Sequence, residues 1–281
     1  ARVIALRTGA VDLIDYVLFK DMVTIEADKS LFLTSDKQSG YGWLGFRVER
    51  PPFNDVKVRQ ALAYALDRKA IMETAFSGRG KPMTGGLIPE SCVGYNDLEG
   101  RYTFDPDKAK KLLAEAGFAK PSDLKFKLLS TSTYTVISLP AQAVHGQLKA
   151  LGVDVELVLQ EWLTFRQTVQ AGTFPAHVWG SAPGFLDPDF LSPQLESTKF
   201  FAPQLGFKDD QLDRWFADGR AEPNADKRKA IYKKIEERVL DLVPWTYLVR
   251  REQAEAGRSF VKGYEHIPVV WSSVTLRETW L

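Results

Sequence analysis

The sequence predicts an α/β fold, because strand-like and helix-like segments alternate along its central part. Residues 123–129 alternate apolar side chains with lysines, residues 139–152 carry a helical apolar pattern that ends at a glycine, and residues 153–159 alternate again. A strand, a helix and a strand in this order form a right-handed unit with parallel strands in nearly all proteins. The chain contains no internal repeat and no low-complexity run.

Two short helices are expected within residues 53–71, FNDVKVRQALAYALDRKAI. The apolar residues of this segment recur at the spacing of one helix face; they are Val58, Ala61, Leu62, Ala65 and Leu66. Asn54 or Asp55 can cap the first helix, and Asp67 can cap the second. Upstream, residues 39–48 are rich in aromatic residues and glycine, which is typical of a strand or a close-packed crossover.

The later elements follow from capping residues and periodicity. Residues 103–118 are the best-marked helix, with Asp105 as N-cap, Pro106 at the first helical position and Gly117 as the stop. Two more helices are expected at 161–172 and 224–242, and two more strands at 175–181 and 245–256.

Composition and charge exclude several classes of partner. The chain has 281 residues, enough for one large or two ordinary domains. Lys+Arg is 37 against Asp+Glu 36, so the net charge of +1 gives no reason to expect nucleic acid or a membrane surface as partner. No run approaches the ~20 apolar residues of a membrane span. The single cysteine, Cys92, excludes an intrachain disulfide.

No motif for catalysis or metal binding is present in the sequence. His145, His177 and His266 have no second His or Cys at metal-ligand spacing. Cys92 has no nearby His, and the glycine loops and nucleophile motifs of common enzyme classes are missing. Asp187 and Asp189 form either a carboxylate pair or an Asp-Pro-Asp turn, and the turn is the commoner arrangement. We therefore expect no enzyme, no cofactor and no metal site.

Several segments together resemble one protein family. PPFNDVKVRQALAYALDRKAI, residues 51–71, resembles the signature region of the peptide/nickel class (family 5) of extracellular solute-binding proteins, which serve ABC transporters. ALRTGAVDLID, GYGWLGFRV, GLIPESCVGYN and YTFDPDKAKKLLAEAGF resemble further blocks of that family in the same order. The resemblance implies a type II periplasmic-binding-protein fold, mostly its C-terminal lobe, with a mixed sheet flanked by helices and the ligand between two lobes.

The resemblance also implies a division of the chain. Residues 1–45 correspond to a remnant of lobe I, residues 46–250 to lobe II, which is the ligand-binding lobe, and residues 251–281 to a C-terminal return to lobe I. The region that builds most of lobe I in the family has no counterpart here. We therefore expect the chain to be a C-terminal fragment of a longer protein.

The ligand-facing positions depart from those of the dipeptide-binding relatives. Those relatives place an Asp in the loop after the strand at 175–181, where this chain has Gly184, and an Arg before the helix at 139–152. Here no Lys or Arg occurs between Lys127 and Lys149. A buried ammonium or carboxylate without a partner costs several kcal/mol, so a free zwitterionic dipeptide is not the expected ligand.

The candidate ligand site is mainly aromatic and neutral. It consists of Trp43, Tyr134, Trp179, Ser181, Gly184, Phe185, Asp187 and Tyr247. Ring faces and hydroxyl groups suit a sugar, a capped or longer peptide bound through its backbone, or a chelate stacked on rings. The alternative for each aromatic residue is ordinary core packing.

The function expected from the resemblance is that of the substrate-binding component of an ABC import system. The partners would be a small-molecule or peptide ligand and the membrane permease of the transporter, and the location periplasmic, or extracellular and membrane-tethered. The alternative is a solute-sensing domain of a transcription regulator, which a DNA-binding motif in a longer chain would reveal. An enzyme is the third class, and no site for it is found.

Overall fold

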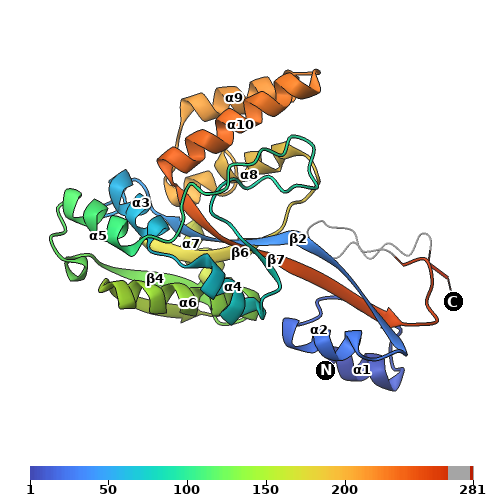
Figure 1. The fold of residues 1–281 in the computed structure, drawn as a ribbon. Helices are drawn as coiled ribbons and strands as arrows, with labels where there is room; N and C mark the ends of the chain where they lie inside the picture. The colour runs from blue at the N-terminus through green and yellow to red at the C-terminus, as the bar shows by residue number, and fades with distance from the viewer. Residues whose placement is uncertain (265–278, 281) are drawn as a thin grey trace.

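A mixed β-sheet forms the centre of the computed structural model, which describes residues 1–264 and 279–280 (Figure 1). The described strands follow the order β1-β7-β2-β6-β4-β5, and β3 also pairs with β7. Their bounds are β1 Leu13–Ile14, β2 Leu31–Phe46, β3 Gly80–Pro82, β4 Lys125–Thr131, β5 Asp154–Gln160, β6 Ala176–Ser181 and β7 Trp245–Arg258.

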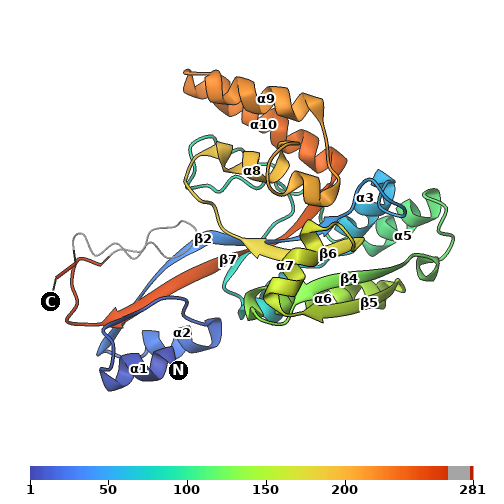
Figure 2. The ribbon, with the colours of Figure 1, turned by 180° about the vertical axis from the view of Figure 1, so that it is seen from behind.

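Helices cover both faces of this sheet, as the two opposite views in Figures 1 and 2 show. The helices of the described residues are α1 Arg2–Thr8, α2 Phe19–Glu26, α3 Val56–Tyr64, α4 Arg68–Phe76, α5 Pro106–Glu115, α6 Thr135–Leu151, α7 Trp162–Gln170, α8 Ser192–Leu195, α9 Asp210–Ala221 and α10 Ala225–Leu242. None of them combines the length and the apolar composition that a membrane span requires.

The predicted strand–helix–strand unit is confirmed. β4 and β5 are parallel, with Lys125 opposite Asp154, and α6 connects them. β6 pairs with β4 on its other side, also in parallel. β2 is antiparallel to both β6 and β7, so the sheet as a whole is mixed.

The predicted helix caps are also confirmed. The side chain of Asp55 accepts a hydrogen bond from the backbone N–H of Lys57 at the start of α3. Asp67 accepts one from Ala70 at the start of α4, and Asp105 one from Lys108 at the start of α5. The apolar stripe of residues 58–66 is buried, as its spacing predicts.

Some helices differ from the sequence prediction. α6 begins at Thr135 rather than at residue 139, and Pro140 lies inside it. The residues of its first turns, such as Ile137 and Ser138, are buried, so packing favours the longer helix although proline interrupts the hydrogen-bond ladder. α1, α2 and α9 were not predicted at all. α9 nevertheless has a clear cap, Asp209, whose side chain accepts from the backbone N–H of Leu212 at 2.8 Å.

The core is divided into three clusters of buried residues. One lies between the sheet and α3 to α6, and the second lies on the opposite face, under α7 to α10. The third is small and joins α1 and α2 to the far ends of β2 and β7; it consists of Leu6, Ile14, Val17, Met22, Ile25, Leu31, Ala254 and Ala256. Figure 1 shows α1 and α2 at the end of the long β2–β7 ribbon, away from α9 and α10.

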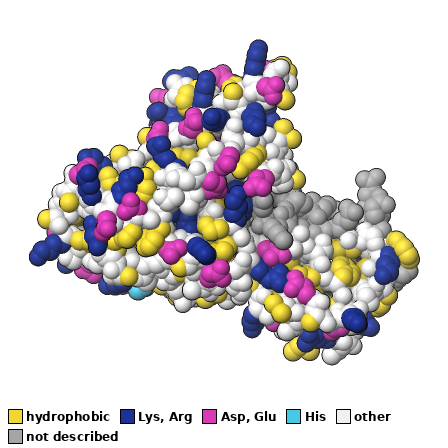
Figure 3. Space-filling view, in the orientation of Figure 1, with side chains coloured by type: hydrophobic (Ala, Val, Ile, Leu, Met, Phe, Trp, Pro, Cys, Tyr) yellow, Lys and Arg dark blue, Asp and Glu magenta, His cyan; other side chains and the backbone are white. Residues whose placement is uncertain are grey.

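The two long strands connect the small cluster with the larger body. Their pairing is irregular at two places, between Asp36 and Gly40 and between Tyr41 and Trp43 of β2. The predicted division at residues 45 and 250 falls within or beside these strands and stays a prediction. The greater part of the predicted return segment, 265–278 together with 281, lies outside the described residues. Charges of both signs are interspersed on the face shown in Figure 3.

Candidate functional site

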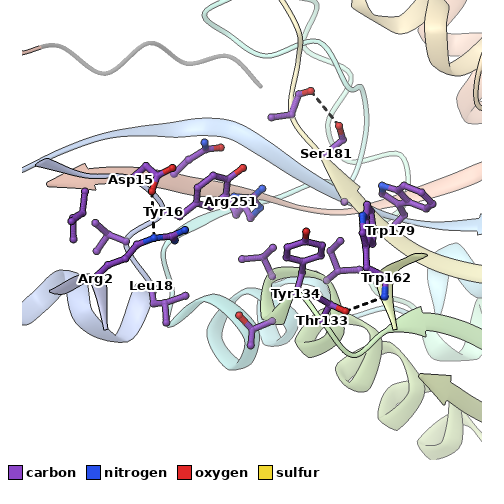
Figure 4. Close-up of a pocket in the computed structure, with 18 of the residues that line it drawn as sticks. Arg2, Asp15, Tyr16, Leu18, Thr133, Tyr134, Trp162, Trp179, Ser181 and Arg251 are labelled. Atoms are coloured by element: carbon purple, nitrogen blue, oxygen red, sulfur yellow. Dashed lines mark hydrogen bonds and ion pairs between the residues drawn. The ribbon is translucent and has the colours of Figure 1, made fainter. Parts of the chain in front are cut away.

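A cavity of about 870 Å³ lies between the N-terminal segment and the larger body (Figure 4). Pockets for small molecules in proteins typically measure ≈ 300–1,000 Å³. The wall is contributed by residues 1–3, 14–18 and Asp21 on one side, by 133–137, Trp162, Arg166, 179–182, Phe200 and Phe201 on the other, and by Arg251 and Gln253 of β7. The cavity therefore lies where both parts of the chain and the strands that join them meet.

One wall of the cavity is a cluster of aromatic rings. The rings of Tyr134 and Trp162 meet edge to face, with centroids 5.0 Å apart, and Trp162 meets Trp179 in the same way at 5.2 Å. The hydroxyl of Thr133 accepts a hydrogen bond from the backbone N–H of Trp162 at 3.0 Å, which holds the start of α7 against the loop before α6. Tyr134 is 40 % exposed, so a bound molecule can reach its ring.

Trp179 forms the base of this wall and is largely a core residue. It is only 6 % exposed and packs against Phe165, at 4.9 Å between ring centroids. Trp43 lies opposite it on β2, with the two rings nearly parallel. Trp43 and Tyr247 are both buried, and the described part of the cavity wall does not include them. The structure therefore places these two aromatic residues behind the wall.

The predicted loop residues fall into two groups. Ser181 lines the cavity together with Trp179 and Tyr134. Gly184 and Phe185 are exposed, and neither is among the lining residues described, nor is Asp187. The carboxylate of Asp187 forms an ion pair with Arg228 of α10 at 2.7 Å and caps the turn that follows by accepting from the backbone N–H of Asp189. The hydrogen bonds from Arg228 lower the pKa of Asp187.

Charged residues reach the cavity from segments that the sequence prediction did not consider. Residues 128–148 contain no cation, but Arg2, Arg166 and Arg251 all line the cavity. Nε of Arg2 lies 3.5 Å from Oδ1 of Asp15. The guanidinium of Arg166 lies 6.0 Å from the centre of the Trp162 ring. No spacing in the sequence joins these residues, because only the fold brings them together.

The described residues show no arrangement for metal binding, and burial perturbs the pKa of one histidine and of the cysteine. No group of His, Cys, Asp and Glu in this part of the chain can hold a metal ion. Burial lowers the pKa of His177 to about 4, so its ring is neutral at pH 7. Burial also raises the pKa of the Cys92 thiol to about 12, which keeps it from forming the reactive thiolate.

Comparison with known proteins assigns the family. Residues 1–201 match the bacterial extracellular solute-binding proteins, family 5, middle region. Heme-binding protein A of Haemophilus influenzae is 30% identical over 267 residues, which are 94% of this chain and 49% of that protein. The dipeptide-binding protein of Escherichia coli is 30% identical over 254 residues, 87% of this chain and 46% of the relative.

A solved structure supports the same assignment. The PBP AgaA from A. tumefaciens R10, in complex with agropinic acid, is 34% identical and superposes with a TM-score of 0.85 over 95% of this chain and 55% of its own. The chain belongs to the bacterial extracellular solute-binding proteins of family 5, and its fold is that of the type II periplasmic binding proteins. It spans about half the length of the curated relatives that it matches.

Proposed function

We propose that the polypeptide containing this chain is the substrate-binding component of an ABC import system. The observation that carries this proposal is the cavity of about 870 Å³, whose wall comes from the N-terminal segment, from the larger body and from β7, which joins them. A solute bound there contacts both parts at once. Two relatives carry heme and dipeptide in their names, and AgaA was solved in complex with agropinic acid, which is consistent with a small solute as cargo.

The partners follow from the family. Its members are extracellular solute-binding proteins, so the protein acts in the periplasm or tethered to the outer face of a membrane. It delivers its solute to the membrane permease of an ABC transporter. Nucleic acid is not a partner, in line with the balanced charge of the chain.

The chain is the C-terminal half of a longer polypeptide in this proposal. Its coverage of 49% and 46% of two relatives supports this. The missing half builds most of lobe I. Residues 1–45 and 251–281 belong to lobe I, and residues 46–250 form lobe II.

The solute is peptide-like or another small polar molecule that stacks on aromatic rings, and it is not a free zwitterionic dipeptide. Gly184 supplies no carboxylate for an ammonium group, and residues 128–148 supply no cation. Tyr134, Trp162 and Trp179 supply rings instead, and an aromatic pair contributes about 0.5–1.5 kcal/mol beyond area burial.

Calorimetry on the longer polypeptide tests the ligand class. The solute that co-purifies is identified by mass spectrometry and titrated into the wild type, Tyr134→Ala and Trp179→Ala. We expect each variant to bind at least tenfold more weakly, about 1.4 kcal/mol. Tyr134→Ala is the cleaner test, because Trp179 is 6 % exposed and its truncation also removes core contacts. Phe104→Ala is the matched control, since Phe104 is 51% exposed and does not line the cavity as described.

Two results would contradict the proposal. One is micromolar binding of several unmodified dipeptides, with the same affinity in Tyr134→Ala and Trp179→Ala as in the wild type. The protein would then be an ordinary dipeptide carrier. A purified polypeptide that carries no solute and binds none would contradict the transport function itself.

Closure on the solute provides a second test. The lobes are expected to close about β2 near residues 41–48 and β7 near residues 245–252, and the closed state is favoured because the ligand contacts both lobes. Small-angle scattering of the longer polypeptide should show a smaller radius of gyration with saturating solute. An unchanged radius would count against closure.

A further inference from the structure

Arg251 enters the cavity through a space that glycine leaves open. It lies on β7, opposite Gly40 of β2 and Gly80 of β3. A Cβ atom at Gly40 would lie 2.5 Å from Cζ and 2.7 Å from Nε of Arg251. The guanidinium stem therefore lies directly against the backbone of β2, and any larger residue at position 40 would displace it.

The guanidinium of Arg251 has no acceptor within the described part of the chain. Arg251 is 8% exposed, yet no hydrogen bond or ion pair joins its side chain to residues 1–35, 40–264 or 279–280, whose side chains the structure describes. The other buried arginines differ. Arg68 donates to the backbone oxygen of Tyr247 at 2.7 Å, and Arg59 and Arg250 donate to backbone oxygens as well. A buried cation without a partner is costly, so an acceptor is expected at this position.

The surroundings of Arg251 leave that position open to a bound molecule. Figure 4 shows Arg251 and Tyr16 beside the cavity, with Tyr134 and Trp162 across from them. Tyr16 has a φ of 50°, a conformation that bulky residues rarely adopt and that often marks a functional position. Asp15 lines the same cavity, and its carboxylate pairs with Arg2.

We propose that Arg251 binds a carboxylate of the solute, so that the substrates are organic acids whose aromatic or apolar part lies against Tyr134 and Trp162. This inference rests on the proposed transport function. The planar guanidinium fork matches a carboxylate with two parallel hydrogen bonds, and the ring wall opposite accepts the uncharged part. A capped peptide with a free C-terminus and an aryl carboxylic acid both have this chemistry.

The test compares acids with their own amides. The probes are N-acetylated di- to tetrapeptides and indole-3-propionate, each as the free carboxylate and as the carboxamide, titrated into the longer polypeptide by calorimetry. The proteins are the wild type, Arg251→Gln and Arg251→Lys. Arg258→Gln is the control, because Arg258 is the last residue of β7 and does not line the cavity as described.

We expect the wild type to bind the acid of at least one pair tenfold or more tightly than the amide. Arg251→Gln should lose that preference. Its affinity for the amide should stay within about twofold of the wild-type value, which would show that the variant is folded. Arg251→Lys should retain part of the preference, and Arg258→Gln all of it. Equal binding of acids and amides by the wild type, or an acid preference that survives in Arg251→Gln, would overturn the inference. So would the failure of every acid to bind. The proposed function fails separately, if the purified polypeptide carries no solute in native mass spectrometry and binds none of the acids or amides.

Discussion

Glu236 is a buried carboxyl group on α10 whose two oxygens have different surroundings. Oε1 accepts hydrogen bonds from the backbone N–H groups of Leu87 and Ile88, at 2.7 and 2.8 Å. Oε2 is buried and has no hydrogen-bond partner among the described residues. Burial raises the pKa of Glu236 from 4.5 to about 8, so the folded protein holds this proton at neutral pH.

This proton makes stability depend on pH. Between pH 4.5 and 8 the folded state binds a proton that the unfolded state has released, so the free energy of unfolding should fall as pH rises. His177 acts in the opposite direction below pH 6.5, because its folded pKa is about 4. From pH 6.5 to 8 the Glu236 effect should reach up to about 2 kcal/mol, at 1.36 kcal/mol per pH unit.

Urea denaturation at pH 6.5 and 8 measures the effect. Glu236→Gln should show a flatter pH dependence than the wild type. Glu237→Gln is the control, since Glu237 is next to Glu236 in the chain but has an exposed carboxylate. Its pH dependence should match that of the wild type. The same slope in Glu236→Gln as in the wild type would show that the proton is not held there.

The aromatic residues show how far single positions can be predicted from sequence. Trp43 and Tyr134 carry the same signal in the sequence, an aromatic residue near a turn or strand, yet one is 1% and the other 40% exposed. Which aromatic residue faces a cavity depends on the neighbours that the fold supplies. Arg251 and Tyr16 are even harder to predict, because nothing local relates two residues so far apart in the chain.

Gly219 of α9 and Gly146 of α6 make a matched pair at the scale of helix packing. Both lie inside a helix. A Cβ atom at Gly219 would lie 2.8 Å from Cε2 of Tyr232 on α10, whereas a Cβ at Gly146 would have no atom within 4 Å. The close approach of α9 and α10 thus depends on one missing methyl group.

Alanine at these two positions should have opposite effects. Gly146→Ala should raise the free energy of unfolding by roughly 0.5–1 kcal/mol, because alanine is the better helix former. Gly219→Ala should lower it by about 1–3 kcal/mol, because overpacking outweighs the helix propensity. Urea denaturation of both variants measures the difference. Stabilisation by Gly219→Ala would mean that the helices separate without cost.

A local start signal made α3, α4 and α5 predictable, and its absence hid α1 and α2. The cap of α9, Asp209, is an equally local signal that the sequence prediction missed. The N-caps of α3, α4 and α5 are visible in the sequence as Asp55, Asp67 and Asp105. A cap can be found this way because its side chain bonds to a backbone N–H only two or three residues further along the chain. α1 begins without a side-chain cap, and α2 likewise. Both depend on contacts with the distant strands β2 and β7, which no window of sequence contains.

The small core under α1 and α2 should be the least stable part of the isolated chain. Among the described residues it contains 8 buried apolar residues, against 30 in the cluster that includes α5. Ile4 and Val23 are also more than half exposed, at 67% and 62%. Few buried contacts mean a low free energy of local opening.

Hydrogen exchange of the chain alone checks this. Amides of α1 and α2 should exchange faster than those of residues 106–116, and they should become protected in the longer polypeptide, where the rest of lobe I covers them. Equal protection of both regions in the monomeric chain would show that the division into lobes is wrong.

Because β2 and β7 pair in an antiparallel way, the chain enters and leaves the larger body through two neighbouring strands. Gly45 and Trp245 are register partners, so the chain enters and leaves this body at one point. A module with adjacent ends tolerates insertion and exchange, because both junctions are made at the same place. Two splices there would transplant the counterpart of residues 46–244 from a relative as one cassette. A reporter whose output follows the cassette's solute could then be assembled with only two junctions, provided that the core contacts of Leu44 and Trp245 beside them are kept.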